Sequence, residues 1–142
     1  NDSSGSNVSY SHNSYDLPDE TNSIKWSDLS NYAAVNQYYQ SLINLRKNHP
    51  ALKMTSWNNI NSYDITSSPE AGILVSQING AAVGDSWKNI IVIYNAQPDY
   101  TYLLPSGNWN LVLNDGNPVA TTPTVVSGSV VAKGTAVTIL YQ

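Results

Sequence analysis

The sequence predicts a mainly β fold, in which an antiparallel β-sandwich follows one amphipathic helix. Six to seven short apolar segments follow residue 71, and turn-forming residues separate them at intervals of roughly 8–12 residues, as in antiparallel sandwiches. Before them, one segment from Asn31 to Pro50 has the periodicity of a helix. No long linker separates this segment from the strands, so we expect the helix to pack close to the sandwich.

The chain begins with two polar segments. The first ten residues are rich in Ser, Asn and Gly without periodicity, so we expect a loop there. Ser11 to Trp26 mixes acidic, amide and aromatic side chains around Pro18, and it is too irregular for a helix or a strand. Loops of this kind often carry binding residues, which makes this segment a candidate site.

The helix follows. Its apolar residues recur at steps of three and four, which places them on one face of an α-helix. A second set lies beside them and widens the apolar face. The first set is Ala34, Tyr38, Leu42 and Leu45, and the second is Val35, Tyr39 and Ile43. Pro50 stops the helix, because a proline disfavours a helical conformation of the preceding residue. So wide an apolar face requires a packing partner.

The rest of the chain reads as short β-strands after one short helical turn. The turn is predicted at Ser56 to Tyr63, with Trp57, Ile60 and Tyr63 pointing inward. The apolar run from Asn89 to Tyr94 is typical of a central strand covered on both faces. The other predicted strands are Gly72–Ile78, Tyr100–Leu104, Trp109–Leu113, Thr124–Val126, Ser129–Val131 and Ala136–Tyr141.

Composition excludes several classes of protein. The net charge is −4, only 11% of residues are charged, and no basic patch exists, which argues against nucleic acid as a partner. Cysteine is absent, so disulfides and thiolate metal sites are excluded. No apolar run approaches the ~18 residues of a membrane-spanning helix. Tyr and Trp are plentiful, and such rings line carbohydrate sites as well as ordinary β cores.

No complete catalytic set can be drawn from the residues. Asp16, Asp19 and Glu20 lie within five residues, but a retaining glycosidase needs two carboxyl groups facing each other across the substrate. A solvated acidic loop, or contacts to sugar hydroxyls, fit them better. His12 and His49 lack metal-ligand spacing, and His49 has the place of a structural residue at a helix end. We therefore expect no catalytic residue and no metal site in this chain.

The residues resemble a known family. Asn13 to Trp26 is similar to the signature N-S-Y-x-x-P-D-x-x-N-x-I-x-W of type I pullulanases. Tyr38 to Ala51 is similar to a second segment of that family, Y-Y-x-x-L-I-x-L-R-K-x-H-P-A. These enzymes belong to glycoside hydrolase family 13, the α-amylase superfamily. Further similar segments, in the family's order, are Val92–Ala96, Leu104–Trp109, Ser127–Gly128 and Ala136–Gln142.

The resemblance implies that the chain is the C-terminal part of a debranching enzyme. Residues 1–50 would be the loop after strand 8 and the last helix of the catalytic (β/α)8 barrel, and 51–142 the C-terminal all-β sandwich domain. The catalytic carboxylates of the family come from earlier barrel strands, so nothing in this chain corresponds to them. The parent enzyme would hydrolyse α-1,6-glucosidic linkages in pullulan, starch or glycogen with retention of configuration, and this chain alone would be inactive.

The expected partners are an α-glucan and the upstream catalytic part of the same enzyme. The loop residues expected to border the glucan are Asn13, Tyr15, Asp16, Asp19 and Asn22. No cofactor is expected in this chain, while calcium in the parent enzyme stays open. Richness in Asn, Ser and Thr favours an extracellular or cell-surface bacterial protein. Two alternatives remain: a free-standing carbohydrate-binding β-sandwich module, and another specificity of the α-amylase superfamily.

Overall fold

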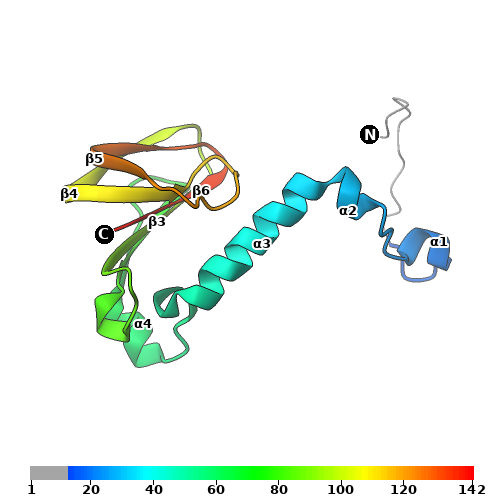
Figure 1. Ribbon diagram of the computed structural model, residues 1–142, viewed down its shortest axis with the longest axis horizontal. Coiled ribbons are helices and arrows are strands. Elements are labelled where there is room, and N and C mark those ends of the chain that lie inside the picture. The colour runs from blue at the N-terminus through cyan, green and yellow to red at the C-terminus, as the bar shows by residue number, and fades with distance from the viewer. Residues whose placement is uncertain (1–12) are drawn as a thin grey trace. The chain divides into compact units, whose positions relative to one another are not determined.

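A computed structural model describes residues 13–142, and the chain divides into two compact units. One unit ends at Ala33 and the other runs from Ala34 to Gln142. The loop expected over the first ten residues, and His12, lie outside the described residues. The proposed boundary at residue 50 concerns the complete enzyme and stays a prediction. Figure 1 shows the elements in chain order.

The first unit contains two single-turn helices, α1 (Asp19–Asn22) and α2 (Asp28–Asn31). Each ends because the next residue leaves the helical conformation: Ser23 has a ψ of 144° and Tyr32 a ψ of 39°. Ser11 to Trp26 is therefore less irregular than expected, because α1 follows Pro18 directly. Proline fits this position, since the first N–H groups of a helix have no partner inside it.

The second unit contains two α-helices, two short 3₁₀ helices and six strands. The helical elements are α3 (Ala33–Asn48), which begins one residue before the unit does, η1 (Pro50–Lys53), α4 (Trp57–Tyr63) and η2 (Ala81–Val83). The strands are β1 (Asp64–Ser67), β2 (Ile73–Asn79), β3 (Asn89–Asn95), β4 (Tyr100–Leu113), β5 (Thr124–Ala132) and β6 (Ala136–Tyr141).

All six strands form one antiparallel sheet in the order β1-β2-β3-β6-β4-β5. The mainly β, antiparallel character expected from the sequence is confirmed. The expected sandwich needs correction, because hydrogen bonds join the strands continuously instead of dividing them between two sheets. As expected, β3 is an inner strand with both faces covered, and four of its consecutive residues are buried.

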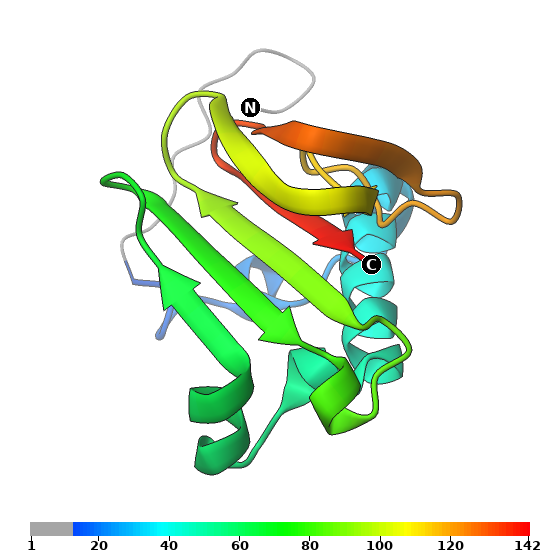
Figure 2. The same ribbon diagram turned by 90° about the vertical axis from the view of Figure 1, so that its left-hand side faces the viewer.

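The sheet coils strongly, so that its two ends enclose one hydrophobic cluster. Side chains from β2, β3, β4, β5 and β6 meet in this cluster. The side-chain amide of Gln77 on β2 donates to the hydroxyl of Tyr102 on β4 at 3.2 Å, although β3 and β6 lie between these strands in the sheet. Side chains stand roughly perpendicular to a flat sheet, so this bond requires coiling. Figure 2 shows β4 and β5 turned across the direction of β2 and β3.

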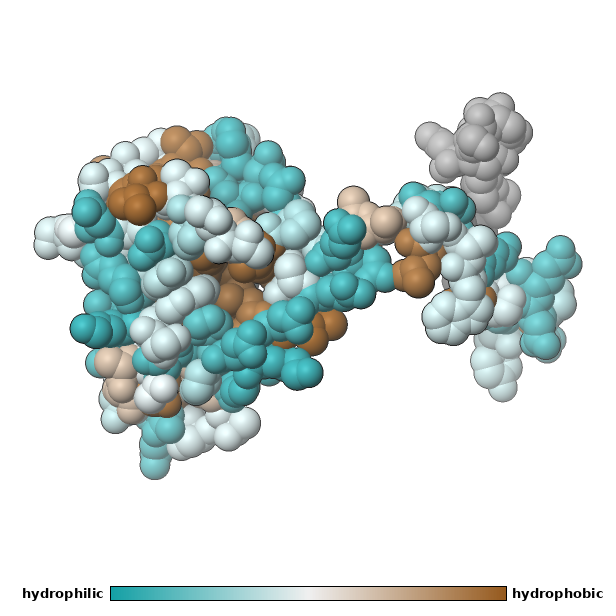
Figure 3. All heavy atoms as spheres, in the orientation of Figure 1, coloured by the Kyte–Doolittle hydropathy of each residue, from teal (hydrophilic) through white to brown (hydrophobic). Residues whose placement is uncertain are grey.

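Helix α3 covers the opposite face of the sheet. Leu45 is buried there, and Tyr38 and Leu42 pack beside it against Val92 and Ile139 in a second hydrophobic cluster. This is half of the wide apolar face expected for the helix. Figure 3 shows hydrophobic surface along the line where α3 meets the sheet.

The other half of the apolar face has no cover within the described part of the chain. Val35, Tyr39 and Ile43 follow one another at steps of four residues and are 54%, 62% and 56% exposed. We call these three residues the outer stripe. A helix in a globular protein normally turns its apolar residues inward. Within residues 13–142, the outer stripe is therefore left without a packing partner.

Three sequence-based expectations about the chain after Pro50 were wrong. Tyr100–Leu104 and Trp109–Leu113 are one strand, because the residues between them form an irregularity in the pairing with β5 instead of a turn. Thr124–Val126 and Ser129–Val131 are likewise one strand, which continues through Ser127 and Gly128. Trp57 does not point inward: it is 73% exposed, while Ile60 and Tyr63 on the same helix are half-buried.

No helix in the described range 13–142 is long and apolar enough to cross a membrane.

Candidate functional site

The loop expected to contact substrate is shaped by its own asparagines. Asn22, the last residue of α1, donates from its side-chain amide to the carbonyls of Ser14 at 2.8 Å and Leu17 at 2.9 Å. The side-chain oxygen of Asn13 accepts the backbone N–H of Tyr15 at 3.0 Å, which is a local turn typical of asparagine. Asn13 and Asn22 therefore set the course of the loop between them.

The remaining expected site residues lie exposed on this loop. Tyr15 is 91% exposed, and Asp16 and Asp19 are exposed as well. Within residues 13–142, the Tyr15 hydroxyl and the carboxylates of Asp16 and Asp19 make no hydrogen bond. The structure therefore brings one aromatic ring and two carboxylates together on one short segment, free to meet a ligand. Their contact with substrate stays a prediction.

The described residues contain no cluster of three or more His, Cys, Asp or Glu side chains that could hold a metal ion. One buried acidic side chain is nevertheless present. Asp85 has a fully buried carboxylate, which accepts the Nδ1 hydrogen of His49 at 2.8 Å and the backbone N–H groups of Ala51 at 3.0 Å and Trp87 at 2.9 Å. Each carboxylate oxygen thus has a donor.

Burial raises the pKa of Asp85, but the hydrogen bonds from His49, Trp87 and Ala51 outweigh it and hold the pKa below the ordinary 3.8. The His49 ring lies 3.7 Å from that of Trp87, and Trp87 stacks on Tyr141 at 4.0 Å. These contacts join the end of α3 to β6. These contacts agree with the structural role expected for His49.

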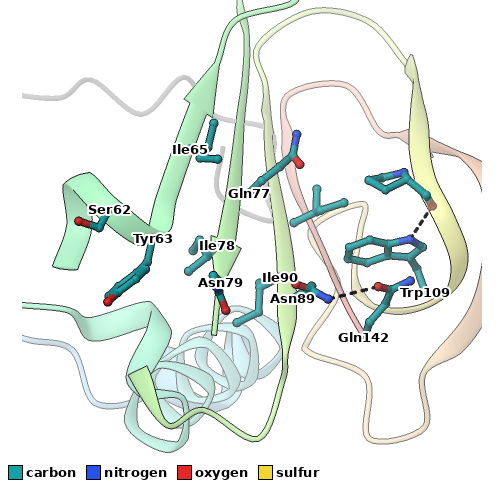
Figure 4. Close-up of a pocket in the computed structure, with 12 residues that line it drawn as sticks. Ser62, Tyr63, Ile65, Gln77, Ile78, Asn79, Asn89, Ile90, Trp109 and Gln142 are labelled. Atoms are coloured by element: carbon teal, nitrogen blue, oxygen red, sulfur yellow. Dashed lines mark hydrogen bonds between the residues drawn. The ribbon is translucent and has the colours of Figure 1, made fainter. Parts of the chain in front are cut away.

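A pocket of about 380 Å³ opens on the face of the sheet that encloses the first hydrophobic cluster. Tyr63 at the end of α4 lies on one side and Trp109 of β4 on the other (Figure 4). Between them lie the amide side chains of Asn79, Asn89 and Gln142. Sequence reasoning missed this pocket. The available signal was that each of these three amides ends or adjoins an apolar strand.

The chain is similar to pullulanases. Residues 67–117 match the family model described as the pullulanase all-beta domain. A pullulanase of Bacillus subtilis is 29% identical over 130 residues, which cover 91% of this chain and 18% of that protein. The solved pullulanase from Bacillus acidopullulyticus is 32% identical with a TM-score of 0.84, over 92% of this chain and 16% of the other. The type I pullulanase of Bacillus subtilis, solved with maltose, is 27% identical with a TM-score of 0.80, and the match covers 91% of this chain and 18% of that protein.

This chain spans less than a fifth of the length of these relatives. The match nevertheless extends well beyond the all-beta domain, since nine-tenths of the chain aligns in sequence and in structure. The signatures quoted from the sequence therefore agree with independent likenesses in sequence and in fold. The chain is similar to pullulanases over nine-tenths of its length, and residues 67–117 match the family model of their all-beta domain.

Proposed function

We propose that this chain is the C-terminal part of a pullulanase-type hydrolase that cleaves α-1,6-glucosidic linkages in pullulan, starch or glycogen. The outer stripe of α3 is the observation that carries the proposal. One side of this helix is packed on the sheet, while Val35, Tyr39 and Ile43 are left to water. A catalytic barrel supplied by the rest of the enzyme accounts for the stripe, because α3 would be the last helix of that barrel.

Chemistry in such an enzyme requires two carboxyl groups about 5 Å apart, one acting as nucleophile and the other as acid and then base. These carboxylates would come from the upstream barrel, and the reaction would retain the anomeric configuration. The present chain would supply binding groups only and would be inactive alone. We place the complete enzyme outside the cell or at its surface.

The loop from Asn13 to Asn22 would border the glucan. Tyr15 offers an exposed ring to the apolar face of a glucose unit. The carboxylates of Asp16 and Asp19 would accept hydrogen bonds from sugar hydroxyls, and charged acceptors form stronger bonds than neutral ones. Asn13 and Asn22 would act by holding these three side chains in place. The maltose complex of the Bacillus subtilis relative supports a glucan as the ligand.

The test is hydrolysis of pullulan by the complete protein, measured as reducing ends. We expect cleavage by the complete protein and none by the 142-residue chain. Ala substitutions at Tyr15, Asp16 and Asp19 in the complete protein should raise KM, whereas Glu70→Ala, an exposed acid outside this loop, should change nothing. Cleavage confined to α-1,4 linkages would replace the proposal with another specificity of the α-amylase superfamily.

A further inference from the structure

We propose that the pocket between Tyr63 and Trp109 is a second sugar-binding site, which takes a neutral α-glucan oligosaccharide on the all-beta domain itself. The choice of an α-glucan rests on the proposed function. The existence of the pocket does not rest on the proposed function, because the register of the strands places its polar groups.

Strand register places four polar or aromatic groups in one row. Asn79 of β2 pairs directly with Asn89 of β3. The backbone N–H of Gln142, which follows β6, donates to the carbonyl of Asn89 at 2.9 Å, so these two residues are also opposite each other. Opposed residues of antiparallel strands direct their side chains to the same face. Asn110 of β4 pairs with Tyr141, which brings Trp109 to the end of the row beside Gln142.

We call Asn79, Asn89 and Gln142 the amide row. Neighbouring strands lie about 4.8 Å apart, so the amide row is a ladder of donors and acceptors across three strands. Gln77 lies two residues before Asn79 on β2, so it is on the same face, and it adds a fourth amide to the pocket lining. In Figure 4, Asn79 and Asn89 lie between the rings of Tyr63 and Trp109, and Gln142 lies beside Trp109.

The amide row is only loosely bonded within the protein. The Asn89 side chain donates to that of Gln142 at 3.4 Å, and Gln142 donates to the carbonyl of Ser106 at 3.4 Å, which is beyond the usual range. The side-chain oxygen of Asn79 accepts the backbone N–H of Ala82 at 3.2 Å. Within the described residues, the side-chain nitrogen of Asn79 and the hydroxyl of Tyr63 have no hydrogen-bond partner. These groups are therefore available to a ligand at little loss of internal bonding.

The opposite end of the same face shows the contrast. The side-chain amide of Asn95 is buried and donates to the carbonyls of Pro98, Ala132 and Lys133 at 2.9–3.1 Å. Its oxygen accepts the backbone N–H of Gln97 at 2.8 Å. An amide placed for stability thus uses all its bonding capacity inside the chain, as buried polar groups generally do. The amide row, by contrast, leaves part of its hydrogen-bonding capacity unused within the described residues.

The lining favours a sugar over a charged ligand. None of the twelve side chains that line the pocket is charged, so nothing there would compensate the charge of a phosphate or a carboxylate. Carboxamides both donate and accept, which matches the hydroxyls of a sugar. Ile65 is exposed and supplies apolar surface for the hydrogens of a pyranose ring, while Ile91 and Trp109 are buried and form the floor of the pocket. The indole N–H of Trp109 is already bonded to the carbonyl of Pro105 at 3.0 Å, so this residue contributes its ring alone.

The test is an NMR titration of the 142-residue chain with maltotetraose, in parallel with cellotetraose. We expect maltotetraose to shift the side-chain signals of Asn79, Asn89 and Gln142 and the indole signal of Trp109. Because a neutral hydrogen bond contributes a modest free energy, the double variant N79A/N89A should weaken binding about tenfold. The matched control is Asn117→Ala, an exposed amide that does not line the pocket.

An unchanged urea midpoint for N79A/N89A would establish that the variant is folded. The inference is overturned if maltotetraose shifts none of these signals, or if N79A/N89A binds it as tightly as the parent chain. Equal binding of cellotetraose would overturn the assignment to α-glucans. The proposed function is read separately, from pullulan hydrolysis by the complete parent protein, so either hypothesis can fail without the other.

Discussion

Replacing Asp85 with alanine should destabilise the sheet domain more than removal of any exposed acid. The carboxylate is fully buried and accepts three hydrogen bonds, two of them from the backbone N–H groups of Ala51 and Trp87. Alanine leaves these donors without an acceptor. An unsatisfied buried polar group costs about 1–3 kcal/mol.

Two such backbone donors, at about 2 kcal/mol each, give an expected loss of about 4 kcal/mol in the free energy of unfolding of D85A. With a urea m-value of about 2 kcal/mol/M, the midpoint should fall by ~2 M. Tryptophan fluorescence suits this assay, because Trp87 lies in the ring stack beside the pair.

The matched control is Asp99→Ala. Asp99 also accepts two hydrogen bonds, from Lys133 at 2.8 Å and from the backbone N–H of Gly134 at 3.0 Å, but its side chain is half exposed. Exposed ion pairs contribute little, so D99A should shift the midpoint far less. Equal midpoints for D85A and D99A would refute the reasoning that burial gives the Asp85 contacts their weight.

Three further predictions follow from particular contacts. Hydrogen bonding holds the pKa of Asp85 below 3.8, so its contribution to stability should be complete above pH 3.8 and should be lost as the pH falls through the folded pKa. Urea midpoints of the parent and D85A, measured from pH 6 to 2.5, should therefore converge at the acid end. A constant difference between the two midpoints would contradict this. Gly80→Ala should lower the free energy of unfolding in urea by ~1–3 kcal/mol, because its Cβ would lie 2.1 Å from the Trp87 carbonyl oxygen. The control is Gly84→Ala, whose Cβ meets no atom within 4 Å and whose only cost is the left-handed φ of 75°. A smaller loss of stability for G80A than for G84A would be inconsistent with the close approach. Asn22→Ala removes the hydrogen bonds to the carbonyls of Ser14 and Leu17. The complete enzyme should then show a raised KM for pullulan, while the urea midpoint of the sheet domain stays the same. An unchanged KM would show that substrate binding does not depend on the shape of this loop.

Much of the fold could be predicted because its inner elements are strongly apolar. β2, β3 and β6 are apolar runs bounded by turn residues, and their expected ranges agree with the structure to within one residue. The helix was equally clear from its periodicity and from Pro50, although it begins at Ala33 instead of Asn31. In these segments local sequence and burial favour the same structure, so the two kinds of evidence agree.

The errors lie where turn-forming residues occur inside strands. Pro105, Ser106 and Gly107 read as a turn, but Gly107 has a φ of 114° and allows β4 to continue through an irregular pairing with β5. Gly128 has a φ of 74° within β5. Glycine in a strand marks a bulge or bend as often as a turn, and only the partner strand decides between them. The edge strand β1 is short and largely exposed, so its sequence carries no burial pattern.

The candidate sites were predictable to different degrees. The loop from Asn13 to Asn22 stood out by its composition, although the hydrogen bonds of Asn22 could not be foreseen. His49 and Asp85 are 36 residues apart and follow no spacing rule. The amide row depends on the register between β2, β3 and β6, which a single sequence does not specify. These features are long-range consequences of the fold.

The central claim, that the outer stripe of α3 is buried by the rest of a larger enzyme, is tested most directly by hydroxyl-radical footprinting of Tyr39. This residue is 62% exposed in the present chain. The account predicts that Tyr39 reacts readily in the 142-residue chain and is strongly protected in the complete protein. Equal reactivity of Tyr39 in the two would contradict it.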